Sequence, residues 1–172
     1  GEKSEWFYTG HLGEYLGEQL ESYDRLPVEP ITGRHASEQD VVEWALAWSS
    51  DAPQLVAESY VNLIPTVAGG THVNGLRAGI TDAVREFCEF RNLLPRGIKL
   101  TAEDVWDRAC YVLSIKLRDP QFAGQTKEKL SSREAAALVE THARDACGLW
   151  LNQHPDAGER IAQFAIANAQ ER

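Results

Sequence analysis

The chain has 172 residues, of which 43% are apolar and 25% are charged, and its formal net charge is −9 at pH 7. This length predicts one domain, and the composition is that of an ordinary soluble globular protein. No apolar run approaches the ~20 residues that a membrane span needs, and no signal peptide is visible, so we expect a cytoplasmic protein without membrane contact. The sequence contains no methionine and starts at Gly1, which favours a fragment of a longer protein.

The acidic charge restricts how the chain could bind nucleic acid. Because neutralised phosphates supply most of the nonspecific affinity of DNA-binding proteins, a domain whose whole surface bound DNA would be basic. This chain is acidic. Any contact with DNA must therefore come from a local group of arginines, while the acidic remainder faces elsewhere.

The cysteine and histidine patterns do not indicate a metal site. Cys88, Cys110 and Cys147 lie far apart in apolar contexts, where a thiol usually behaves as a small apolar side chain. A zinc site would need close pairs of ligands, and neither the cysteines nor the five histidines form such pairs. We predict structural packing for the cysteines and no metal in this chain.

The periodicity of apolar residues predicts the element order β-α-β-β-β-α-α-β-α-α. Three successive strands joined by short turns favour an antiparallel meander, and the alternation within 40–49 predicts a half-buried strand. The predicted ranges are strand 5–8, helix 10–22, strands 31–36, 40–49 and 55–64, helix 71–91, a brief helix from 101, strand 110–117, and helices 131–153 and 156–172.

The second half of the chain gives the clearer signals. Strand 110–117 is apolar on both alternating faces, which is typical of a central strand. Thr101 with Asp104 and Ser131 with Glu134 have the spacing of capping boxes. The helix after Ser131 is expected to bury three apolar side chains, Leu138, Ala146 and Leu149. Together the elements predict an α/β fold of the α+β type, a two-layer structure with helices on one face of the sheet.

A polar loop, residues 119–132, separates the central strand from the following helix. A proline and a glycine keep it out of regular structure, and it presents Gln125, Thr126 and Lys127. An amide, a hydroxyl and an ammonium are donors suited to an anion, and to phosphate above all. From the residues alone, a solvated turn and a phosphate-binding loop both remain open.

Two segments resemble motifs of the B subunits of type II topoisomerases, the gyrase B family. Residues 119–127, Asp-Pro-Gln-Phe-Ala-Gly-Gln-Thr-Lys, are similar to the family's Gln-Thr-Lys loop. Residues 69–77, Gly-Gly-Thr-His-Val-Asn-Gly-Leu-Arg, resemble its Gly-Gly-Thr-His segment. The motifs follow the family's order and spacing, and the resemblance covers essentially the whole chain. Three further stretches match the topoisomerase IV branch of Gram-negative type more closely than gyrase: 59–66, 85–97 and 103–108.

The resemblance implies that residues 1–172 are a transducer domain with the left-handed β-α-β crossover of the small-subunit ribosomal protein domain 2-like fold. In the family, the residues that correspond to Gln125 and Lys127 contact the γ-phosphate of ATP, which a preceding N-terminal domain binds. The arginine that corresponds to Arg77 points into the cavity through which DNA passes. We expect no catalytic residue in this chain, and the N-terminal ATP-binding and C-terminal metal-binding domains are absent from it.

The parent protein implied by the resemblance is an ATP-dependent type II DNA topoisomerase, which relaxes and decatenates DNA by passing one duplex through another. Its B subunit would form a homodimer, act on DNA with the A subunit of topoisomerase IV, and use ATP and Mg²⁺, with the metal held outside this fragment. The transducer domain of the DNA gyrase B subunit remains an alternative. A non-catalytic protein-interaction domain is the alternative from a different class.

Several single residues also have two interpretations. Arg77 could be an exposed helix arginine paired with Asp82 rather than a residue that faces DNA. His72 could act as a general base, but its place beside two glycines at a helix start favours packing or local hydrogen bonding. The tryptophans at patterned positions are expected in the core rather than as stacking platforms for bases: Trp44, Trp48 and Trp106.

Overall fold

The computed structural model describes residues 11–51 and 56–172, and the structural statements below concern those residues. The predicted strand at 5–8 lies outside them. The elements are α2 Leu12–Gln19, β1 Leu26–Ala36, β2 Val41–Trp48, β3 Ala57–Val61, β4 Ile64–Pro65, α3 Thr71–Phe90, α4 Ala102–Trp106, β5 Ala109–Lys116, α5 Arg133–Gln153 and α6 Pro155–Glu171. The predicted mixed α/β class is confirmed. None of the described helices combines the length and the apolar character needed to cross a membrane.

The five strands of the described chain form one sheet in the order β1-β2-β5-β3-β4, so the predicted meander is wrong. β5 lies between β2 and β3, antiparallel to the first and parallel to the second. Its side chains are buried on both faces, and such a strand is stabilised most in the middle of a sheet. Pairing β3 directly with β2 would have left this apolar strand at an edge. The α3–α4 segment connects the parallel pair, and the left hand of this crossover stays a prediction from the resemblance.

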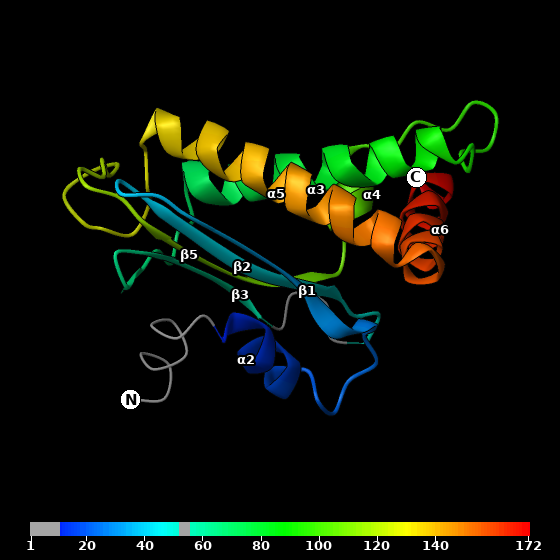
Figure 1. Cartoon of the computed structure of the whole chain (residues 1–172), viewed down its shortest axis with the longest axis horizontal. Coiled ribbons are helices and arrows are strands. Elements are labelled where there is room, and N and C mark those ends of the chain that lie inside the picture. The colour runs from blue at the N-terminus through cyan, green and yellow to red at the C-terminus, as the bar shows by residue number, and fades with distance from the viewer. Residues whose placement is uncertain (1–10, 52–55) are drawn as a thin grey trace.

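Helices lie on both faces of the sheet, whereas the sequence predicted them on one (Figure 1). α3 and α5 cover one face, with Trp44 and Trp48 in the core beneath them, and α2 covers the opposite face. The second, smaller core joins Leu16 of α2 to Ala45 and Ala47 of β2. Because those alanines leave room for a helix, β2 is buried on both faces rather than half-buried as predicted.

The helices α3 and α5 pack closely because α3 carries glycines at their contact. A Cβ atom at Gly79 would stand 2.5 Å from the carbonyl oxygen of Glu140, and one at Gly75 would overlap the carbonyl oxygen of Ala136. Glycine is the residue that permits such close backbone approach. The two helices therefore lie backbone against backbone over the sheet.

Two details predicted for α5 are wrong. Ser132 precedes the helix instead of Ser131, and its hydroxyl accepts a hydrogen bond from the Gln121 amide at 2.8 Å rather than capping α5. Leu149 is 60% exposed. The contact with the glycines of α3 sets the rotation of α5, so its buried row consists mostly of small side chains: Ala135, Val139, Ala143, Cys147 and Leu151.

The three cysteines are all buried and form no disulfide within the described chain, as structural packing requires. Burial raises the pKa of Cys88 to about 11, with a contribution from Glu89, and raises the pKa of Cys147 to about 12. A thiol that stays protonated at neutral pH is a poor nucleophile and a poor metal ligand. The packing role predicted for these cysteines is confirmed.

Candidate functional site

The Gln-Thr-Lys loop leaves the end of β5 and returns to α5 as a short hairpin. Phe122 and Leu130 form an antiparallel bridge. Beyond it, the amide of Ala123 donates to the carbonyl of Lys129 at 2.9 Å. Residues 124–128, called here the loop tip, are all exposed. The hairpin therefore holds the three polar side chains of the motif in solvent.

The foot of this hairpin is bonded to the start of α3. The Ala68 amide donates to the Glu128 carbonyl at 2.9 Å, and the Leu130 amide donates to the Gly69 carbonyl at 3.1 Å. The Leu130 carbonyl in turn accepts from the Thr71 amide at 3.1 Å. The two segments singled out in the sequence thus meet at one end of the sheet (Figure 1). We call the following residues the loop base: Ala68, Gly69, Gly70, Thr71 and Leu130.

Gly70 is the position at which the loop base depends on glycine. Its φ of 138° lies in a region that L side chains rarely adopt. A Cβ atom there would stand 2.5 Å from the amide nitrogen of Leu130 and 2.8 Å from its Cβ. The Leu130 side chain is 1% exposed and belongs to the main core, so it has little room to move away. Any other residue at position 70 must displace Leu130 or the turn itself.

His72 is fully buried next to the loop base and links α3 to β3. Its Nε2 lies 3.1 Å from Thr66 Oγ1, which lies 2.7 Å from Ser59 Oγ. Because the Ser59 hydroxyl donates to the Thr66 carbonyl at 3.1 Å, the network assigns the Thr66 hydroxyl as donor to Ser59 and His72 Nε2–H as donor to Thr66. Burial lowers the pKa of His72 to about 4, so the ring is neutral at pH 7. The predicted local hydrogen bonding is confirmed.

Gln125 and Lys127, the predicted phosphate contacts, lie in the loop tip. Both side chains are exposed, and neither forms a hydrogen bond or ion pair with any residue of the described chain. Lysine carries a compact charge on a long stem, and the glutamine amide adds two N–H donors. The tip therefore offers an uncommitted ammonium and amide to an anion outside this chain. Both residues lie on the same exposed hairpin, and their contact with phosphate stays a prediction.

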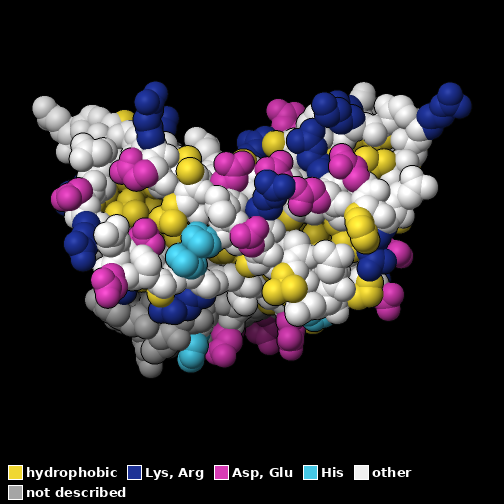
Figure 2. All heavy atoms as spheres, turned by 45° about the horizontal axis from the view of Figure 1, so that its top comes forward, with side chains coloured by type: hydrophobic (Ala, Val, Ile, Leu, Met, Phe, Trp, Pro, Cys, Tyr) yellow, Lys and Arg dark blue, Asp and Glu magenta, His cyan; other side chains and the backbone are white. Residues whose placement is uncertain are grey.

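Arg77 lies on α3, about 9 Å along the helix axis from its first residue at 1.5 Å per residue. It is half-buried, and within the described part of the chain it forms no ion pair with Asp82 or any other acid. Figure 2 shows basic and acidic side chains interspersed over the helical face, not one continuous basic surface. A DNA contact on this face would therefore be local, as the net charge predicts.

A known protein family matches nearly the whole chain. A family model described as DNA gyrase B matches residues 12–172. The chain belongs to this family. The resemblance that the motifs predicted is confirmed by that match, which includes both the loop tip and the loop base.

Individual relatives are named as topoisomerase IV subunits. The DNA topoisomerase 4 B subunit of Salmonella typhimurium is 58% identical over 167 residues, which are 97% of this chain and 26% of the relative. The corresponding B subunit of Pseudomonas aeruginosa is 55% identical over 172 residues, 100% of this chain and 27% of the relative. The chain thus spans about a quarter of the length of the curated relatives it matches.

A solved structure from the same family has a similar fold. The topoisomerase IV ATP binding domain of Francisella tularensis, in complex with a small molecule inhibitor, matches with a TM-score of 0.83 and 38% sequence identity. The match covers 94% of this chain and 43% of that chain.

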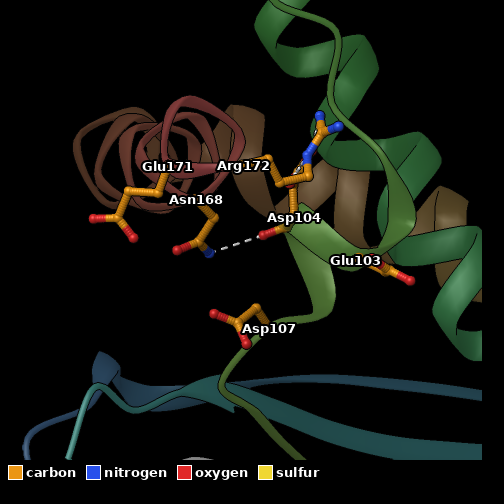
Figure 3. A pocket seen from close by; sticks show the side chains of 6 residues that line it. All are labelled: Glu103, Asp104, Asp107, Asn168, Glu171 and Arg172. Carbon is orange, nitrogen blue, oxygen red and sulfur yellow. Dashed lines mark hydrogen bonds and ion pairs between the residues drawn. The ribbon is translucent and has the colours of Figure 1, made fainter.

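A second polar region lies where α4 meets α6, and Figure 3 shows the six residues that line its pocket. The carboxylate of Glu103 points away from those of Asp107 and Glu171 (Figure 3). In the described part of the chain, no group of three or more His, Cys, Asp or Glu residues could hold a metal ion. The acidic residues of this pocket therefore do not form such a cluster.

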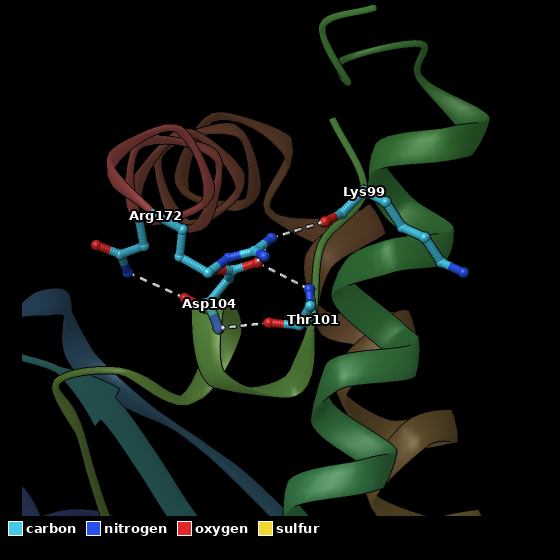
Figure 4. A network of polar contacts seen from close by, with 5 residues as sticks. Lys99, Thr101, Asp104 and Arg172 are labelled. Carbon is cyan, nitrogen blue, oxygen red and sulfur yellow. Dashed lines mark hydrogen bonds and ion pairs between the residues drawn. The ribbon is translucent and has the colours of Figure 1, made fainter. Parts of the chain in front are cut away.

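Asp104, the most buried of these acids, is occupied by structural bonds (Figure 4). The predicted capping box is confirmed, since the Thr101 amide donates to Asp104 Oδ2 at 2.8 Å and the Asp104 amide donates to Thr101 Oγ1 at 3.3 Å. The guanidinium of Arg172 donates two hydrogen bonds, of 2.8 and 2.9 Å, to the same carboxylate. Burial acts to raise the pKa of Asp104, but the hydrogen bonds from Arg172 and Thr101 outweigh it and lower the pKa. No local pattern could have predicted Arg172 as the partner of Asp104.

Proposed function

We propose that this chain is the transducer domain of a B subunit of topoisomerase IV type, in which Gln125 and Lys127 contact the γ-phosphate of ATP bound by a separate nucleotide-binding domain. The observation that carries the proposal is an exposed, unpartnered lysine and glutamine on a hairpin whose base is fixed to the core. Nothing within the described chain uses these side chains, so their partner is sought outside it. The Francisella relative, named as an ATP binding domain, is more than twice as long as the segment matched here, which leaves room for such a domain.

The chemistry of the loop tip suits a terminal phosphoryl group. Ammonium and amide N–H groups form charge-assisted hydrogen bonds with phosphate oxygens, and the long stem of Lys127 lets the charge follow a group that shifts. Contact with the γ-phosphate favours one position of this domain relative to the nucleotide, and loss of that group removes the preference. We place a Mg²⁺ ion bound with ATP in the nucleotide-binding domain, outside this chain, as the resemblance implies.

The proposed parent enzyme passes one DNA duplex through another. In that setting the B subunit is a homodimer that works with the A subunit of topoisomerase IV in the cytoplasm, and Arg77 of each copy faces the transported DNA. The half-buried, unpaired guanidinium of Arg77 supports this role, because it can contact a phosphate without first breaking an ion pair. The 58% and 55% identities to topoisomerase 4 subunits support this branch over gyrase. An intact-enzyme supercoiling assay separates the two, since negative supercoiling belongs to gyrase.

The test compares two neighbouring lysines in the full-length protein. Lys127→Ala should lower the rate of ATP hydrolysis by about 100-fold, the loss typical of one transition-state donor. Lys129→Ala removes the same charge from the same exposed loop and should leave the rate within about twofold, as a surface change does. Near-normal hydrolysis in the Lys127 variant would remove the phosphate role. As a second check, calorimetry on the 172-residue chain alone should detect no ATP binding.

A further inference from the structure

The loop tip is connected to the helical layer along two routes. Along the chain, the loop runs directly into α5 at Arg133. Across space, three backbone hydrogen bonds join it to the start of α3, two of them made by Leu130 and the third by Glu128. The loop is therefore attached at its base to both helices.

The two helices respond as one body because their backbones are in contact. Gly75 and Gly79, one turn apart on α3, lie against the backbone carbonyls of Ala136 and Glu140 on α5. Arg77 lies between these glycines in the sequence of α3. A close-packed contact of this kind transmits a shift rather than deforming, because side chains in a packed interior have few alternative arrangements. The start of α3 at the loop base and the arginine on its second turn thus lie on one closely packed helix.

We propose that the contact between Gly70 and Leu130 couples the phosphate contact of Lys127 to the DNA contact of Arg77, which makes Gly70 and Leu130 positioning residues for the coupled reaction. The inference rests on the proposed function of the loop tip. The coupling should not tolerate a substitution at Gly70. A Cβ atom there would overlap the backbone of Leu130, the residue through which the loop and α3 are bonded. The tip and α3 would then no longer have a fixed spacing.

Coupling of two binding sites is measured as a change in one affinity caused by the other ligand, and it is reciprocal. The full-length protein, assembled with its A-type partner, is titrated with duplex DNA in the presence and absence of a non-hydrolysable ATP analogue. The ratio of the two DNA dissociation constants is the readout. This ratio differs from one in the wild type, and Gly70→Ala moves it toward one by about tenfold, within the range of measured allosteric couplings.

The matched control is Gly97→Ala. Gly97 also has a positive φ, 81°, but a Cβ atom there meets nothing within 4 Å. This variant places an alanine at a positive φ away from the loop base, so its ratio should equal that of the wild type. A Gly70→Ala ratio equal to the control, or a wild-type ratio of one, overturns the coupling role. Lys127→Ala separates the two ideas: if it removes the ratio while Gly70→Ala keeps it, the phosphate role stands and this inference fails.

Amide hydrogen exchange tests the same point without a substitution, should Gly70→Ala fail to fold. In the wild-type assembly, the analogue should slow exchange at the loop tip and, together with it, at the amides of Ala68, Thr71 and Leu130, which form the three bonds of the loop base. Protection of the tip with no change at these three amides overturns the inference.

Discussion

The tip and the base of the Gln-Thr-Lys loop differ in nearly every physical property, although a few residues separate them. The tip is exposed, and Gln125 and Lys127 have no partner within the described chain. The base is bonded through its backbone, buries Leu130 in the core and has no room for a Cβ atom at Gly70. The proposed phosphate contact and the anchoring of the loop would therefore be carried by separate residues. Changes at the tip should alter function at constant stability, and changes at the base should alter both.

The largest expected effect on stability is at the base. Leu130→Ala removes a side chain that is 1% exposed and should lower the free energy of unfolding by about 2–5 kcal/mol, the range for such cavities. Leu149→Ala is the matched control, because that leucine is 60% exposed on α5 and its loss should cost about 0.5 kcal/mol or less. Urea unfolding of the 172-residue chain measures both. Equal losses in the two variants would contradict the distinction between base and surface.

The second effect is a pH dependence from His72, next to the loop base. The pKa of His72 is about 4 in the folded chain and 6.5 in a free histidine, so the unfolded chain binds more protons between these values. Stability is then fully present above about pH 6.5 and falls as the pH falls toward 4. The His72 share of this loss between pH 7 and pH 5 should be about 2 kcal/mol, at 1.36 kcal/mol per pKa unit.

A variant isolates that share from the carboxylates that titrate in the same range. His72→Gln keeps a polar side chain but does not titrate, so its urea midpoint should change less between pH 7 and pH 5 than that of the wild type. His11→Gln, at an exposed histidine before α2, serves as control and should keep the wild-type dependence. A variant at position 72 with the full wild-type loss would show that this ring is not the titrating group.

The third effect concerns DNA binding by Arg77, which lies on α3 beyond the loop base. Arg77→Gln in the full-length protein should weaken DNA binding and reduce the slope of log affinity against log salt concentration by about one, the value for one lost phosphate contact. DNA-stimulated ATP hydrolysis should fall more than basal hydrolysis. Arg160→Gln removes an exposed arginine from α6 and should change neither quantity. An unchanged salt slope in the Arg77 variant would place this arginine away from DNA.

The smallest effect is expected at the tip itself. Lys127→Ala and Lys129→Ala should each change the free energy of unfolding of the 172-residue chain by less than about 0.5 kcal/mol, because both side chains are exposed. Only the first should affect ATP hydrolysis in the full-length protein. A large loss of stability in the Lys127 variant would mean that the tip packs against this chain, and the separation of tip from base would no longer hold.

The sequence predicted the long helices better than the sheet. The helix expected at 71–91 is α3, Thr71–Phe90, and the central strand expected at 110–117 is β5, Ala109–Lys116. Both have a strong apolar periodicity, which can be recognised from residues that are close together in the sequence. The predicted meander was wrong because the strand order depends on which strand pairing buries the most apolar strand, and local sequence patterns do not compare alternative pairings. The predicted burial of Leu149 was wrong for a similar reason, since contact with Gly75 and Gly79 decides which face of α5 is inward.

The candidate site divides in the same way. The motif that contains Gln125 and Lys127 was visible in the sequence, and so was the Gly-Gly-Thr-His segment. The contact between them was not visible in the sequence. The two segments are distant in the chain and are joined by backbone hydrogen bonds that almost any residue type could make. The glycine at position 70 is the one part of this contact that the sequence shows. A Gly-Gly pair before a helix does not indicate which segment it contacts.

Local sequence patterns were enough to predict the family, the helix positions, the central strand and the polar residues of the loop tip, because each depends on side chains that lie close together in the chain. Tertiary structure alone decided the strand order, the placement of α2 on the second face, the Asp104–Arg172 pair and the bonding of Leu130 to the start of α3. The physical reason is that local patterns fix backbone conformation and amphipathic faces, whereas the choice among distant partners follows from total burial and close packing of the whole chain.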